Sequence, residues 1–129
     1  MVMFDNVKVP WERVFVHNDP ALSRGLYIET AAHSYGNHHS NVRLVVKMQF
    51  LVGLASRIAQ ANGAADVPAV RETLGRLAAL EGVLEALVAG QIEACEEWPV
   101  KGHVTFNRRM MYAALNWGVE NYSMVIDTL

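Results

Sequence analysis

The sequence has one cysteine, Cys95, among its 129 residues, so no disulfide can form within the chain. It does not open with a charged and then apolar leader segment. Charge is sparse and mixed, with 11 basic residues, 13 acidic residues and a net charge of −2. Without a basic patch, neither nucleic acid nor an anionic membrane surface is expected as a partner. These absences predict a cytoplasmic protein.

The sequence also lacks a long uninterrupted apolar run. Its most apolar stretch, from Val42 to Ala61, contains Arg43, Lys47 and Arg57 as well as uncharged polar residues. A single charge near the centre of a bilayer costs about 3 kcal/mol. We therefore expect a helix at the centre of a bundle and no membrane span.

Motifs for self-contained catalysis are missing as well. There is no glycine-rich phosphate loop after a strand, no G-x-S-x-G and no Ser/His/Asp set that order or spacing supports. Cys95 lies beside acidic residues and is expected to pack inertly rather than act as a nucleophile. Arg108 and Arg109 are expected on a solvated face or in a subunit salt bridge. No catalytic residue is assigned.

Three histidines, His33, His38 and His39, lie close together in the sequence, with Glu29 four residues before the first. Metal-binding bundles usually carry Glu-x-x-His on facing helices, and this chain has no such motif. The histidines are expected to cap helices or to form hydrogen bonds in the core. No metal site is predicted.

What the chain does have is apolar side chains, which make up 52% of its residues. The length suits a single domain, and this apolar fraction exceeds what one small core needs. The excess predicts buried partner surfaces and a homodimer or homotetramer.

Residues 1–18 differ from the rest of the chain. The stretch from Val2 to Val16 is rich in β-branched and aromatic residues, and Asp5 and Asn6 form a turn signal within it. Pro10 removes one backbone donor, so a strand here should lie at a sheet edge or be irregular. A lone strand has nothing to pair with. We therefore interpret residues 1–18 as the end of a β-domain with its linker.

Residues 19–129 show helical periodicity and predict an all-α antiparallel bundle. A short helix should start at Pro20, with Asp19 as its N-cap, and end near Ala32, before Gly36 and Asn37 break the pattern. Longer helices are expected over 38–62, stopped by Gly63, and over 67–97, with Asp66 as a candidate N-cap. A last helix should begin near Thr105 or Asn107 and continue to Leu129. Glycines inside these helices should mark close helix-to-helix approach.

One polar stripe stands out on the apolar second helix. His39, Arg43 and Lys47 follow one another at i, i+4 and i+8, so they project from one face. In a mostly buried place two cations need partners. Either acidic residues of the next helix, such as Glu81 and Glu85, neutralise them, or the stripe faces an anionic group of a cofactor or substrate.

Two segments resemble a known family. The first is FDNVKVPWERVFV (Phe4 to Val16), and the second is HHSNVRLVVKMQFLVGLA (His38 to Ala55), which departs from the family pattern at Ser40, where glutamine is more usual. A third and weaker likeness covers Asn107 to Leu129. Together they resemble the large, oxygenase component of the 4-hydroxyphenylacetate 3-monooxygenase family, the two-component flavin-dependent hydroxylases.

The resemblance implies a C-terminal helical domain like that of acyl-CoA dehydrogenases, which assembles dimers and tetramers. In such enzymes reduced FAD, supplied by a separate reductase, serves the hydroxylation of a phenol beside its hydroxyl group. The resemblance also implies that the phenol-binding residues lie upstream and a glycine-rich flavin loop downstream. We therefore expect a truncated domain that binds no cofactor and is inactive alone. His39 and Arg43 are expected to line the flavin or substrate cavity of the intact enzyme, and Lys47 to be structural.

Two other readings stay open. One is a fragment of an enzyme like 4-hydroxybutyryl-CoA dehydratase, which shares the fold and needs an iron–sulfur cluster. The other is a non-enzymatic helical interaction module.

Overall fold

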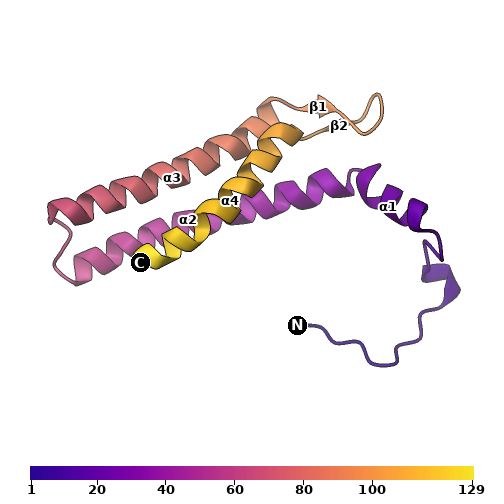
Figure 1. Ribbon diagram of the computed structural model, residues 1–129, viewed down its shortest axis with the longest axis horizontal. Coiled ribbons are helices and arrows are strands. Elements are labelled where there is room, and N and C mark those ends of the chain that lie inside the picture. The colour runs from indigo at the N-terminus through magenta and orange to yellow at the C-terminus, as the bar shows by residue number, and fades with distance from the viewer.

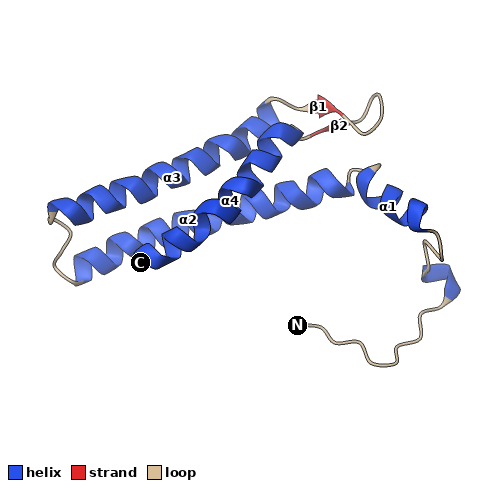
Figure 2. Ribbon diagram, in the orientation of Figure 1, coloured by secondary structure: helices blue, strands red, loops and turns tan.

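The computed structural model describes residues 1–129, and most of them are helical (Figure 2). The α-helices are α1 (Pro20–Ile28), α2 (Ala32–Ala61), α3 (Pro68–Glu93) and α4 (Arg108–Thr128). A short 3-10 helix, η1 (Trp11–Arg13), precedes them, and an antiparallel hairpin of β1 (Glu96–Glu97) and β2 (Val104–Thr105) separates α3 from α4. The predicted all-α bundle is confirmed. None of its helices combines the length and hydropathy that a membrane crossing requires.

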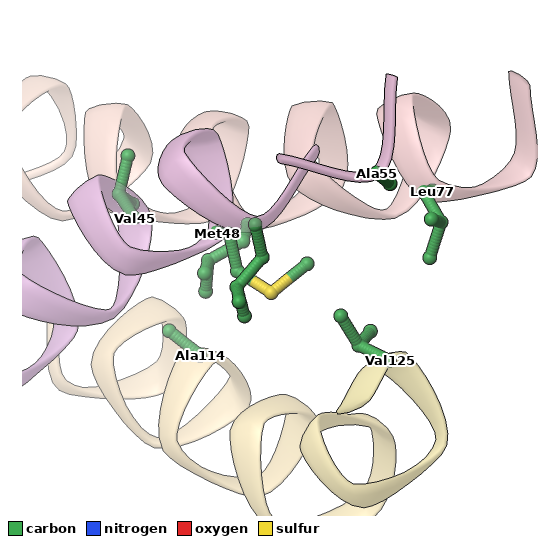
Figure 3. Close-up of a cluster of buried hydrophobic side chains, with 8 residues drawn as sticks. Val45, Met48, Ala55, Leu77, Ala114 and Val125 are labelled. Carbon is green, nitrogen blue, oxygen red and sulfur yellow. The ribbon is translucent and has the colours of Figure 1, made fainter. Parts of the chain in front are cut away.

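The bundle consists of a long antiparallel pair, α2 and α3, with α4 crossing it (Figure 1). Its core lies where the three helices meet. Figure 3 shows Met48 of α2, Leu77 of α3 and Val125 of α4 pointing toward one another. Met48, Leu84, Ala114 and Val125 are completely buried. Burial of a side chain of this size contributes about 1.5–3 kcal/mol, so this cluster orients all three helices.

The N-terminal segment does not form the predicted strand. Apart from η1 and bends, residues 1–18 have no regular structure, and they lead away from the bundle (Figure 1). Their large apolar side chains are exposed, including Phe4 and Phe15, at 81% and 86%. The predicted turn at Asp5 and Asn6 does form, with Asn6 at φ 51°. The strand is missing because no other strand of this chain lies beside the segment to pair with it.

The prediction that Gly36 and Asn37 break the helix is wrong. α2 runs without interruption from Ala32 to Ala61. Its first turns are held by aromatic contacts: the ring of Tyr35 meets Phe106 edge to face at 5.4 Å, and His38 stacks on the same ring at 3.6 Å. These contacts outweigh the roughly 1 kcal/mol by which glycine disfavours a helix.

In the turn between α2 and α3, Gly63 ends α2 as predicted. Gly63 has φ 68°, and backbone bonds from Gly63 to Gln60 and from Ala64 to Ala59 close the end of α2. At the other end, the prediction that Asp66 caps α3 is wrong, because Val67 is the N-cap. Pro68 occupies the first helical position and holds the residue before it in an extended conformation.

The third helix is shorter than predicted, ending at Glu93 instead of Glu97. Asn107 takes over the end of α3: its backbone N–H donates to the carbonyl of Gln91 at 2.9 Å, and its side chain donates to the carbonyl of Ala94 at 3.0 Å. The same side chain accepts from the N–H of Met110 and so caps α4, which begins where predicted. One asparagine therefore ends one helix and starts the next.

Candidate functional site

The stripe of His39, Arg43 and Lys47 lies along α2, as the spacing predicts. All three side chains are exposed, so the expectation that the two cations are mostly buried is wrong. α2 turns Val45, Met48 and Ala55 into the core, and the stripe lies away from that face. The helix contains no aspartate or glutamate along its length. It therefore presents positive charge that no acidic residue of its own offsets.

Of the two alternatives for the stripe, neutralisation by Glu81 and Glu85 is wrong. The structure contains one ion pair, which joins Arg108 to Glu96 at 2.7 Å and involves neither α2 cation. Because the cations are exposed to water, they need no partner within the bundle. The positive charge of the stripe stays available to an external group.

Three shallow hollows open along the stripe. The first lies on the outer surface of α2 and the second beside Ser40, and the third lies between α2 and α4 with a volume of about 300 Å³. Lys47 borders all three, and Arg43 borders the first two. The first is lined by His39, Val42, Arg43, Val46, Lys47 and Phe50. Cations thus lie next to exposed apolar side chains, an arrangement suited to an anionic ligand with a flat apolar part.

α4 fixes one of these cations. The ammonium of Lys47 lies 4.9 Å from the centre of the Tyr122 ring. Close to it, α4 approaches α2 so tightly that a Cβ on Gly118 would lie 2.6 Å from a methyl of Leu44. Lys47 is therefore tied to packing between the helices, and His39 and Arg43 are the freer groups. Sequence reasoning missed Tyr122, although its place one turn after Gly118 put it on the α2-facing side.

The other two histidines take part in internal contacts, as predicted. His33 forms a hydrogen bond with the hydroxyl of Tyr112, and its ring also meets Tyr27 edge to face. His38 bonds through Nδ1 to the side-chain oxygen of Gln91 at 2.8 Å. No group of three His, Cys, Asp or Glu side chains is arranged to hold a metal ion.

Cys95 is exposed and donates to the carbonyl of Ile92, so the prediction that it packs is wrong. Arg108 forms a structural clamp. Its guanidinium lies over the ring of Trp98 at 4.7 Å, and both its backbone N–H and its Nε donate to Glu96. The hydrogen bond from the Arg108 side chain lowers the pKa of Glu96. This clamp fastens the hairpin to α4 and lies outside the stripe.

The fold and the stripe together define a class: a helical-bundle domain with a cationic, acid-free face next to apolar hollows. The donor set suits an anionic group, because Arg43 and His39 can both donate and no carboxylate of α2 competes. The Ser40 hydroxyl already donates to the carbonyl of Gly36 at 3.0 Å. A phosphate-bearing cofactor fits these residues.

Comparison with known proteins gives the family. Residues 23–129 match the model described as "HpaB: 4-hydroxyphenylacetate 3-hydroxylase C terminal". The chain belongs to this family. Its helical bundle is accordingly of the type found at the C-terminus of acyl-CoA dehydrogenases, as the resemblance implied.

Similarity to individual proteins is consistent with this family. The pyoverdin chromophore biosynthetic protein PvcC of Pseudomonas aeruginosa is 36% identical over 87 residues, covering 67% of this chain and 17% of the relative. The 4-hydroxyphenylacetate 3-monooxygenase oxygenase component of Thermus thermophilus is 33% identical over 97 residues, covering 75% and 20%. The FADH(2)-dependent monooxygenase TftD of Burkholderia cepacia is 31% identical over 90 residues, covering 69% and 17%. The chain thus spans about a fifth or less of the length of these relatives.

Proposed function

We propose that this chain is the oligomerisation and flavin-enclosing domain of a two-component flavin-dependent aromatic hydroxylase. The observation that carries the proposal is the stripe: exposed cations without ion-pair partners, on a helix without acidic residues, beside apolar hollows. Family membership and a relative named as an FADH(2)-dependent monooxygenase support it. Reduced FAD, when bound, would supply the activation of oxygen for hydroxylation of a phenol-type substrate.

Within this proposal His39 and Arg43 hold the cofactor. Arg43 offers a planar, permanently charged donor set that suits phosphate oxygens, and His39 lies one turn before it on the same face. Val42, Val46 and Phe50 border the same hollow and would exclude water from an apolar ring. Lys47 stays with Tyr122 and supports the site by holding α2 and α4 together.

The proposal includes a division of the chain and a set of partners. Residues 1–18 form the end of a β-domain with its linker, and residues 19–129 form the C-terminal helical domain. The intact enzyme receives reduced flavin from a separate reductase and works on an aromatic small molecule in the cytoplasm. The helical domain associates as a homodimer or homotetramer, because apolar side chains such as Val83 and Ile92 of α3 are 49% and 51% exposed in the single chain.

A chimera tests the cofactor role. The matching segment of the Thermus thermophilus oxygenase component is replaced by residues 23–129 of this chain, and reduced FAD binding is measured anaerobically. We expect Arg43→Met to weaken binding on the order of tenfold, because one charge-assisted phosphate contact contributes about 1.5–3 kcal/mol. His39→Ala should weaken it less.

Arg57→Met is the matched control, because Arg57 is also an exposed arginine of α2 but lines none of the hollows of the stripe. It should leave FAD affinity unchanged. Equal affinity of the Arg43→Met and parent chimeras would overturn the assignment of Arg43. Equal losses from both arginines would show a general charge effect and overturn it too.

A further inference from the structure

The outer face of α3 is not covered by any other element of the chain. α2 and α4 both pack on the opposite face, where Leu77, Leu84 and Gln91 are buried. Figure 1 shows α3 along the edge of the bundle, with one side turned away from α2 and α4. Most central residues of this outer face are small and exposed: Gly75, Ala78, Ala79, Gly82, Ala86 and Ala89. The exposed Glu85 lies at their border.

The charges of this face are arranged so that the face complements itself. Arg71 lies eleven residues before Gly82, and Glu93 lies eleven residues after it. Eleven residues are close to three turns of an α-helix, so both charges lie on the same side as Gly82. Both are exposed, and neither forms an ion pair within the chain. The basic end of the face therefore matches the acidic end of an antiparallel copy.

The small residues follow the same symmetry. Ala78 and Ala86 lie four residues from Gly82, and Gly75 and Ala89 lie seven residues from it. These offsets again return to the same side of the helix. No atom lies within 4 Å of a Cβ built on Gly82, so nothing in the single chain accounts for a glycine at this helical position.

We propose that α3 of a second copy occupies this face, antiparallel, with the two-fold axis passing at Gly82. Arg71 of each copy then meets Glu93 of the other, and the small residues let the two helix axes approach to about 8 Å. The partner is identified by charge: the face of α2 carries His39, Arg43 and Arg57 but no acidic residue, so two α2 faces repel. The inference rests on the proposed self-association and names its interface.

A charge exchange tests the pairing in the full chain. Sedimentation velocity at micromolar concentration should show a dimer or higher assembly for the natural sequence. Arg71→Glu and Glu93→Arg should each raise the dissociation constant on the order of tenfold, since each replaces two symmetric attractions by repulsions. The double variant should return the dissociation constant to that of the natural sequence. Failure of the double variant to recover, with both single variants helical by circular dichroism, overturns the proposal.

A cross-link tests the position of the axis. In a Cys95→Ser background, Gly82→Cys should form an intermolecular disulfide under mild oxidation, because an axis at this residue brings the two Cα atoms within the 4.4–6.8 Å that a disulfide spans. Gly53→Cys in the same background is the control, since Gly53 is an equally open helical glycine on α2. Assemblies that cross-link through position 53 and not 82 overturn the α3 interface but still support self-association of the domain. A strictly monomeric chain overturns both.

Discussion

At the scale of single residues, the contact between Glu96 and Arg108 joins the hairpin to the start of α4. Glu96 accepts from both the backbone N–H and the Nε of Arg108, at 3.0 Å and 2.7 Å. The side chains remain 31% and 38% exposed, so water screens the pair. Its contribution to stability should be near 1 kcal/mol, the upper end for exposed pairs.

The lowered pKa of Glu96 makes this contribution depend on pH. The folded state binds the proton less tightly than the unfolded state, so the contact stabilises the fold above the unfolded-state pKa and is lost as pH falls through the folded-state pKa. We expect Glu96→Gln to lower the free energy of unfolding by about 1 kcal/mol at pH 7 and by less at pH 3, where protonation of the carboxylate weakens the contact. Urea unfolding at both pH values measures this.

Glu97→Gln provides the comparison, because Glu97 lies in the same hairpin and its carboxylate receives only a backbone N–H, from Gly102. It should change stability less at pH 7. An equal loss for Glu96→Gln at pH 7 and pH 3 would contradict the assigned ion pair.

At the scale of helices, two glycines that both lie inside α-helices differ in how closely a neighbouring helix packs against them. A Cβ on Gly118 of α4 would press on Leu44 of α2 at 2.6 Å, whereas a Cβ on Gly53 would meet nothing within 4 Å. Gly53→Ala should therefore raise the free energy of unfolding by up to about 1 kcal/mol through helix propensity. Gly118→Ala should lack this gain and lower the free energy of unfolding by about 1 kcal/mol, because the terminal methyl of Leu44 must leave its preferred position to make room.

Thermal and urea unfolding of the two alanine variants give the comparison directly. Leu44→Ala removes the methyl that blocks position 118, so Gly118→Ala should be tolerated better in that background than in the natural one. If Gly118→Ala stabilises the natural chain as much as Gly53→Ala does, the close approach of α2 and α4 at this position is wrong.

Elements with strong local signals could be predicted from the sequence. Asp19 and Asn107 mark helix starts because their side chains satisfy backbone donors three residues later. Contacts distant in sequence could not be predicted. Gly36 stays helical because Phe106 packs against its neighbours, and α3 stops at Glu93 because Asn107 receives its end.

In the candidate site, too, local spacing could be predicted and contacts between helices could not. The spacing of His39, Arg43 and Lys47 was enough to place them on one face of α2. Their exposure was not predictable, because it depends on which side of α2 receives α3 and α4. The contact between Lys47 and the ring of Tyr122 was not predictable either, because the two residues are 75 positions apart in the sequence and lie on different helices.

At the scale of the whole molecule, the isolated chain should not hydroxylate phenols. Its hollows are shallow and open, and no acid, base or metal cluster adjoins the stripe. The matched segment covers 15–21% of the length of its relatives, so most of any such enzyme lies outside it. Hydroxylation depends on a site that excludes water around the reacting groups.

The assay supplies the purified chain with FAD, a flavin reductase, NADH and 4-hydroxyphenylacetate, and measures catechol formation by chromatography. We expect no product beyond that of the same mixture without the chain. The chimera described above is the positive control. Product above the free-flavin background would contradict the prediction and assign the chain a catalytic centre of its own.

The acid-free composition of α2 has a consequence for handling the protein. A row of cations on one helix attracts any small oxyanion in solution, and at 0.15 M ionic strength such attraction is screened beyond about 8 Å. We therefore expect sulfate or phosphate in the buffer to compete with weaker anionic ligands for this face. The anion of the buffer should therefore be chosen with care whenever ligand binding to this domain is measured.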